Sequence, residues 1–206
     1  MWAYQRSIHG RRSSSRAMRY PSGHKPQKRK DLLQASGALI KAGGFAATGI
    51  DAMAQAAGVT SGAFYSHFGS KGDLLKALIE RELQHSTEMW AGKLDQSLAQ
   101  WLDYVMHHYL SLDHVQHPES GCVLPALGAE IARSDASVKE VFAHELHKGI
   151  NGLAERLGDP QLATAVISQM VGALLLARAM PTPDAQREVL EASKVVLMRL
   201  ITAAPT

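Results

Sequence analysis

The sequence contains a single cysteine, Cys122, so no disulfide bond can form within the 206-residue chain. A chain of this size without disulfides fits a reducing compartment, and we expect a cytoplasmic protein. Arg11 and Arg12 are followed by no apolar segment, so we expect no export signal.

Long hydrophobic runs are also missing. The longest uncharged run, residues 160–177, is interrupted by polar side chains: Gln161, Thr164, Ser168 and Gln169. A membrane span needs about 20 predominantly apolar residues. We therefore interpret this run as a buried helix and expect no membrane partner.

Acidic residues are absent from residues 1–30, which carry nine of the 22 lysines and arginines. The remaining 176 residues hold 13 basic and 19 acidic side chains, a net charge of −6. A basic N-terminal segment on an acidic body favours a polyanionic partner. Residues 1–26 lack apolar periodicity, so we expect a flexible basic arm, with a solvated tail as the alternative for residues 1–17. Translation could start at Met1 or at Met18.

No segment alternates with a period of two over the length of a strand, so the predicted fold class is all-α. Apolar residues recur at helical spacing from Leu32 to Ala42, and Gly43-Gly44 predicts the end of that helix. A short helix is expected after Thr48, whose hydroxyl would cap it, and another, capped by Thr60 or Ser61, up to His67. Longer helices are predicted from Lys71 to Trp90 and over residues 94–112, 121–133, 136–157, 160–180 and 184–203.

Residues 50–69 predict two short helices that cross at a tight turn. Gly58 supplies the left-handed backbone conformation that such a turn needs, and Ala54 is small enough for close contact. Four apolar residues are spaced to lock the pair: Met53, Ala57, Val59 and Phe64. This arrangement is typical of a helix-turn-helix, whose second helix enters the DNA major groove.

Further residues at fixed spacing surround these helices: Gly44-Phe45, Thr48-Gly49-Ile50, Ala57-Gly58-Val59, Gly62 to Phe68 (GAFYSHF) and Lys71. From about Lys28 to Leu78 this pattern resembles the DNA-binding domain of the TetR family of transcriptional regulators. The resemblance implies an N-terminal three-helix domain over residues 27–72 and a helical ligand-binding and dimerisation domain over residues 73–206. It further implies a homodimeric repressor that binds a palindromic operator and is released by a small-molecule inducer. The inducer, the operator, and the choice between repression and activation stay open.

The residues expected to contact DNA are Lys28, Thr48, Ser61, Gly62, Ala63, Tyr65, His67 and Lys71. The Tyr65 hydroxyl can bond a phosphate, and Lys71 adds charge beside the free N–H groups of a helix N-terminus. The resemblance implies a phosphate contact for Thr48. The turn from Ser61 to Ala63 is small, so weak base contacts are expected from it. Lys25, Lys28, Arg29 and Lys30 would add salt-sensitive phosphate contacts.

His67 admits other interpretations. A catalytic site would need a second histidine or a carboxylate nearby, and Asp73 is the only candidate, so we expect no enzyme. Phe64 and Phe68 are expected to be core residues, and His67 could be structural. The alternative function is a ligand-binding helical protein whose helix-turn-helix serves only for packing.

Residues 94–112 carry aromatic side chains with polar tips, which suit an apolar pocket with a few orienting groups. The predicted ligand pocket consists of Trp101, Tyr104, His108, Cys122 and Leu127, although most of the aromatic face of residues 94–112, Trp101 and Val105 first, could equally be core. Cys122 is expected to start a helix, where the dipole would favour the thiolate. Its Gly-Cys pair resembles a TetR subgroup with members that respond to electrophiles or oxidants, and an inert buried thiol is the alternative.

Several histidines cluster in the sequence: His107, His108, His114, His117, His144 and His147. They lack cysteine partners and well-spaced carboxylates, so we expect neither a metal site nor a cofactor. Helices 160–180 and 184–203 are apolar on more than one face, so a partner subunit is expected to cover them. We therefore expect a homodimer joined through a four-helix bundle, with the core of a monomer as the alternative.

Overall fold

The structure, a computed structural model, describes residues 24–91 and 96–203. Within these residues the predicted all-α fold is confirmed, since helices account for the regular structure and no strand occurs. The helices are α1 (His24–Gly43), α2 (Ile50–Ala56), α3 (Ser61–His67), α4 (Lys71–Ala91), α5 (Leu98–Tyr109), α6 (Leu112–Gln116), α7 (Val123–Arg133), α8 (Ala136–Leu157), α9 (Pro160–Arg178) and α10 (Pro183–Thr202).

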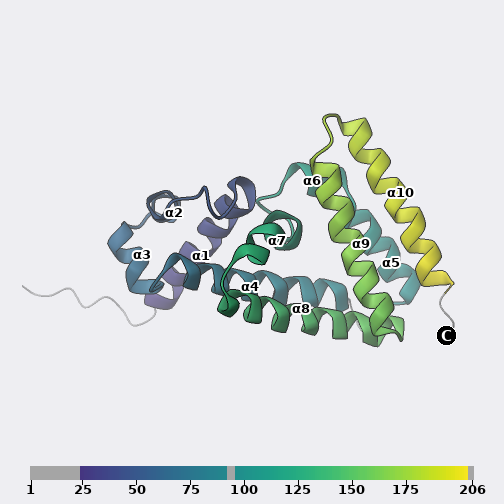
Figure 1. Ribbon diagram of the computed structural model, residues 1–206, viewed down its shortest axis with the longest axis horizontal. Coiled ribbons are helices and arrows are strands. Elements are labelled where there is room, and N and C mark those ends of the chain that lie inside the picture. Colours follow the sequence, from purple (N-terminus) through teal and green to yellow (C-terminus); the bar gives the residue numbers. More distant parts are fainter. Residues whose placement is uncertain (1–23, 92–95, 204–206) are drawn as a thin grey trace, which may run out of the picture.

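The molecule is elongated, with α1, α2 and α3 at one end and α9 and α10 at the other (Figure 1). The long helix α4 begins in the first unit and runs beside α8, which is its most extensive packing partner. Helix α9 packs on both α8 and α10. The short helix α7 lies between the two ends and contacts α1, α4, α8 and α9.

Most predicted helix boundaries agree closely with the structure, with differences at two places. The predicted arm reaches residue 26, but α1 begins at His24. The rest of the arm and the possible start at Met18 lie outside the described residues. The predicted helix 94–112 is interrupted, because Ser97 caps α5 and Ser111 caps a separate helix, α6.

The turns of the N-terminal unit follow the predicted glycines. Gly44 has a φ of +86° and ends α1, and Gly58 has a φ of +64° between α2 and α3. The Thr60 hydroxyl accepts the Ala63 N–H at 3.2 Å, so Thr60 is the cap of α3. The predicted cap of α2 is wrong, since Gly49 holds that position. The Thr48 hydroxyl instead donates to the Gly44 carbonyl at 2.7 Å, because the side chain folds back to close the α1–α2 loop.

The predicted contacts between the two short helices are confirmed. Met53, Ala54 and Phe64 are completely or almost completely buried, and Ala57 and Val59 pack against them. These residues belong to one continuous core that extends through α4 into the larger domain. The orientation of α3 is therefore fixed by apolar packing.

Helix α9 is the one described helix long and apolar enough to cross a membrane by length and composition. Its buried residues, which include Val166, Met170 and Leu174, face the neighbouring helices α8 and α10. A helix that packs in this way is a core helix of the fold. Several other apolar side chains of α9 and α10 are exposed: Leu175, Leu176, Val195, Val196, Met198 and Leu200.

Candidate nucleic-acid interface and ligand cavity

Helix α3 presents one aromatic side chain to solvent and buries another, and the aromatic residue that caps its C-terminal end is buried as well. Phe64 is fully buried and Phe68 is 2% exposed, whereas Tyr65 is 55% exposed. The Tyr65 and Phe64 rings form a T-shaped pair, with 5.5 Å between the ring centroids. The buried rings hold the helix, so the Tyr65 hydroxyl is offered at a fixed position on the surface.

The first turn of α3 is small and open. Gly62 is exposed and Ala63 is half-buried. The Ser61 hydroxyl donates its proton to the Asp51 carboxylate of α2, so the hydroxyl already has a hydrogen-bond acceptor in this structure. These residues leave room for another surface to approach the backbone of α3 closely.

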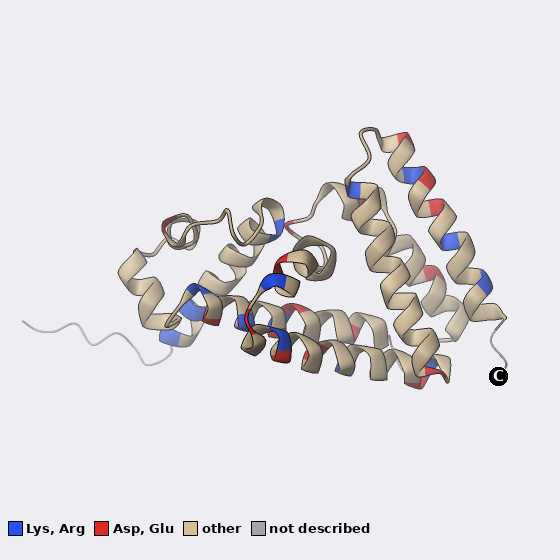
Figure 2. Ribbon diagram, viewed as in Figure 1, with Lys and Arg blue, Asp and Glu red and all other residues tan. Residues whose placement is uncertain are grey.

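Basic residues of α1 lie beside α3. Figure 2 shows α3 free of charged residues and lysines or arginines on the first turns of α1, next to it. Lys25, Arg29 and His67 line one open groove, and the Arg29 guanidinium lies 4.5 Å from the centre of the Phe68 ring. Burial, and then the charges of Lys25 and Arg29, lower the pKa of His67. At neutral pH the groove thus carries its positive charge on lysine and arginine.

Lys71 has a role that sequence reasoning missed. Its ammonium lies 2.5 Å from the Phe45 carbonyl and 3.4 Å from the Ala46 carbonyl, and it sits 4.4 Å from the centre of the Phe45 ring. The lysine therefore holds the α1–α2 loop. Its predicted phosphate contact stays a prediction.

A cavity of about 210 Å³ lies in the larger domain, between α4, α5, α6 and residues 120–122. Of the five predicted pocket residues, His108 and Cys122 line it. Trp101 and Leu127 are 1% and 0% exposed and belong to the core. Tyr104 is 44% exposed on the surface, where its ring stacks on the His108 ring with 4.1 Å between the ring centroids.

His114 closes one side of this cavity in a fixed tautomer. Its Nδ1 lies 2.8 Å from the Tyr109 carbonyl, and its Nε2 lies 2.9 Å from the Cys122 backbone nitrogen. A carbonyl can only accept and an N–H can only donate, so Nδ1 carries the proton and Nε2 accepts. Burial is the main cause that lowers the pKa of His114. The ring is therefore neutral and connects α5, α6 and the start of α7.

Cys122 occupies the N-cap position of α7, so the expected helix start is confirmed. Burial raises the pKa of the thiol, which favours the alternative of an inert buried thiol over a thiolate. The sulfur lies 3.9 Å from the Ser86 hydroxyl on α4. Burial likewise raises the pKa of Tyr109, which also lines the cavity.

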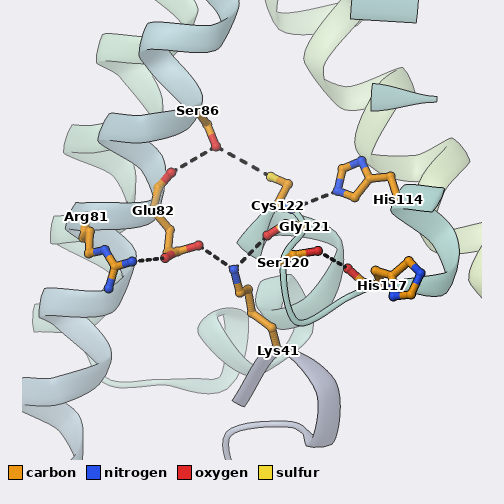
Figure 3. A network of polar contacts seen from close by, with 9 residues as sticks. All are labelled: Lys41, Arg81, Glu82, Ser86, His114, His117, Ser120, Gly121 and Cys122. Carbon is orange, nitrogen blue, oxygen red and sulfur yellow. Dashed lines mark hydrogen bonds and ion pairs between the residues drawn. The ribbon is translucent and has the colours of Figure 1, made fainter. Parts of the chain in front are cut away.

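One lysine connects the N-terminal unit with the edge of this cavity (Figure 3). Lys41, in the last turn of α1, donates to Glu82 on α4 at 2.7 Å and to the Gly121 carbonyl at 2.9 Å. The side chains of Lys41 and Glu82 are 6% and 14% exposed. Both Glu82 and Gly121 line the cavity, so this buried ion pair forms its border on the side of the N-terminal unit.

The clustered histidines do not assemble into a metal centre. Within residues 24–91 and 96–203, no group of three His, Cys, Asp or Glu side chains is placed to hold a metal ion. His107 and His117 instead pair with nearby carboxylates on the surface.

Residues 32–78 match the family model described as bacterial regulatory proteins, tetR family. The resemblance of this chain to the TetR family is confirmed. The matched residues include α2, the turn at Gly58 and α3, which form the helix-turn-helix of this structure. Comparison with curated proteins found no match.

Several solved structures share the TetR-like fold. Reduced NemR of E. coli is 22% identical, with 83% of this chain and 95% of that chain covered and a TM-score of 0.67. A TetR-family regulator of Agrobacterium tumefaciens is 18% identical, with 84% and 98% covered and a TM-score of 0.69. FadR of Bacillus subtilis, in complex with stearoyl-CoA, is 18% identical, with 85% and 99% covered and a TM-score of 0.65. The larger domain therefore shares the fold of TetR-like proteins as well.

Sequence reasoning missed three residues that connect the TetR-like domains: Lys41, Glu82 and Glu130. Lys41 follows the apolar stripe of α1, and Glu130 is the only charged residue between Val123 and Ala132. A lone charge in an apolar helix is the signal that could have indicated a buried partner.

Proposed function

We propose that this protein is a TetR-like transcriptional repressor that binds operator DNA as a homodimer and is released by a small-molecule ligand. The observation that carries the proposal is the exposed Tyr65 of α3 beside the basic start of α1, in a domain that matches the tetR family. A cytoplasmic location follows from this function.

The contacts expected with DNA fall into two groups. Tyr65, His67 and Lys28 would bond phosphates, together with Thr48 and Lys71. Ser61, Gly62 and Ala63 would face base edges. Because these three residues are small, much of the sequence preference would come from DNA shape and from bridging water.

A dimer is supported by the apolar surface of the last two helices. Leu175 and Leu176 on α9 and Val195 and Val196 on α10 are each at least 44% exposed. Packing of α9 and α10 on the same pair of a second copy would cover these side chains in a four-helix bundle. Such a dimer would place two copies of α3 on successive half-sites of a palindrome.

A ligand site is supported by the cavity next to Lys41. FadR is described with stearoyl-CoA, whereas the cavity of this chain is about 210 Å³. That volume favours a compact ligand. Helix α4 lines the cavity and also begins beside α3, so it is the expected mechanical link between ligand and DNA.

Selection of duplexes from a random-sequence pool by the dimer tests this proposal. We expect enrichment of a palindrome whose binding weakens steeply with salt. Lys28→Ala should reduce the slope of the logarithm of the binding constant against the logarithm of the salt concentration (the salt slope) by about one, as expected for one lost phosphate contact. The control, Lys139→Ala on the exposed face of α8, should leave the slope unchanged.

The alternative is a ligand-binding protein whose helix-turn-helix serves only for packing. It predicts that no duplex is enriched, or that Lys28→Ala and Lys139→Ala have the same salt slope as the natural sequence.

A further inference from the structure

Glu130, near the C-terminal end of α7, binds the loop that follows α1. One carboxylate oxygen accepts the Phe45 N–H at 2.8 Å and the other accepts the Ala46 N–H at 2.7 Å. The two sides of this contact are 85 and 84 residues apart in the chain. Both carboxylate oxygens are thus used on consecutive backbone groups of the DNA-binding domain.

The same loop is held from its opposite side by Lys71. The carbonyl groups of Phe45 and Ala46 face the Lys71 ammonium, while their N–H groups face Glu130. Gly44, with a φ of +86°, turns the chain so that it can present both edges. The position of the loop is therefore set by charged side chains on α4 and α7.

The other end of α7 is also joined to the DNA-binding domain. Lys41 of α1 donates to the carbonyl of Gly121, just before α7 begins at Val123. Gly121 and Cys122 line the ligand cavity. A helix shorter than four turns is thus tied to α1 at its start and to the α1–α2 loop at its end.

We propose that Glu130 is a positioning residue for DNA binding, which holds the helix-turn-helix at a fixed orientation on α7. The inference rests on the proposed function, because it assumes that two recognition helices must meet two half-sites. Movement of residues 120–122 by a ligand would shift α7, and Glu130 would carry this shift to the α1–α2 loop. Helix α7 then acts beside α4 as a second link between cavity and DNA.

The physical basis is that hydrogen bonds to a charged group are about twice as strong as those between neutral groups. Without the Glu130 carboxylate, the N–H groups of Phe45 and Ala46 would form hydrogen bonds only with water. The Lys71 and Lys41 contacts and the apolar core along α4 would remain, so the domain should keep its fold while its orientation relative to α7 becomes less narrowly fixed. Glu130→Gln keeps one acceptor oxygen, so its effect should lie between those of the natural residue and of alanine.

The first test measures this orientation without DNA. Spin labels are attached to cysteines introduced at Gln55 on α2 and Asn151 on α8, in a chain whose own cysteine is removed by Cys122→Ala. They report the distance between the helix-turn-helix and the larger domain. Dilution with unlabelled chains keeps the measured distances within one subunit. We expect a narrow distance distribution, which broadens in Glu130→Ala and broadens less in Glu130→Gln. The matched control, Glu140→Ala on the exposed face of α8, should leave it narrow. An equally narrow distribution in Glu130→Ala would overturn the proposal.

The second test uses palindromic duplexes enriched by the natural protein, with one to three base pairs inserted between the half-sites. The natural protein should bind the original spacing more tightly than the altered spacings. In Glu130→Ala this ratio of affinities should be about tenfold smaller, which corresponds to about 1.4 kcal/mol. Unchanged discrimination in Glu130→Ala would contradict the positioning role. If the distance distribution broadens but no duplex is ever enriched, the proposed function fails while the role of Glu130 in holding the domain stands.

Discussion

The ammonium of Lys41 lies 2.7 Å from a carboxylate oxygen of Glu82, and both side chains are largely buried. The pair joins the last turn of α1 to the middle of α4 at the border of the cavity. A buried ion pair of this kind couples two domains because neither charge can be left without a partner at low cost.

Lys41→Met should therefore be strongly destabilising. Removal of one partner of a buried pair costs about 3 kcal/mol or more in unfolding free energy, which urea denaturation measures. Lys76→Met is the matched control, because Lys76 pairs with Asp73 on the surface, where their side chains are 32% and 47% exposed. That change should cost less than about 1 kcal/mol. Equal losses of unfolding free energy in the two variants would show that the Lys41–Glu82 pair contributes no more to stability than an exposed ion pair.

Stability should fall in mild acid because of His114. Burial lowers its pKa below the ordinary 6.5, so the unfolded chain takes up the proton at a higher pH than the folded chain. The contribution of this residue is complete above pH 6.5 and is lost as the pH falls toward the lowered folded-state pKa. His114→Gln should reduce the difference in unfolding free energy between pH 7.5 and pH 5.5. The exposed His85→Gln is the control, and an identical pH dependence in the natural protein and His114→Gln would refute this origin.

Gly149 lets α8 approach α4 closely. A Cβ at this position would lie 2.6 Å from the buried Trp90 ring. Gly149→Ala should thus lower the unfolding free energy by about 1–3 kcal/mol through overpacking. Gly172→Ala, where a Cβ meets nothing within 4 Å, should be neutral or stabilising by up to about 1 kcal/mol. The urea midpoint should fall for Gly149→Ala and stay unchanged or rise for Gly172→Ala, and a neutral Gly149→Ala would contradict the tight α4–α8 contact.

Leu176→Glu tests the proposed dimer. Leu176 is 56% exposed on α9, and a charge there would be buried between two subunits. Sedimentation analysis should show a dimer for the natural sequence and a shift toward monomer for this variant. Leu98→Glu on α5, where the side chain is 39% exposed, should remain dimeric. A dimer in both variants would move the interface away from α9.

Local features of the fold were predictable because they depend on neighbouring residues. Gly58 adopts the positive φ that its position predicted, Gly44 follows the predicted end of α1, and Thr60 caps α3 through the N–H of Ala63. Thr48 shows the limit of local reasoning. Its hydroxyl could either cap α2 or bond a carbonyl of the preceding turn. In the structure it donates to the Gly44 carbonyl and closes the α1–α2 loop.

The contacts between domains were not predictable from spacing. Lys41 meets Gly121 across 80 residues and Glu130 meets Phe45 across 85. Nothing in the sequence orients α7 toward α1. Trp101 illustrates a related limit, because an aromatic face at helical spacing fits a pocket and a core equally well, and tertiary packing placed this ring in the core.

Lys71 is a poor residue for testing DNA contact, because its removal would also free the carbonyl groups of Phe45 and Ala46. Tyr65 is better suited, since the residue is 55% exposed. Tyr104, 44% exposed on α5 and far from α3 in the sequence, offers a matched tyrosine.

The most direct measurement is therefore the affinity of Tyr65→Ala and Tyr104→Ala for a duplex that the natural protein enriches from a random pool. We expect Tyr65→Ala to bind at least about tenfold more weakly, a loss of about 1.4 kcal/mol, and Tyr104→Ala to bind as the natural protein does. Equal affinities of the two variants and the natural protein would contradict the assignment of α3 as the DNA-contacting helix.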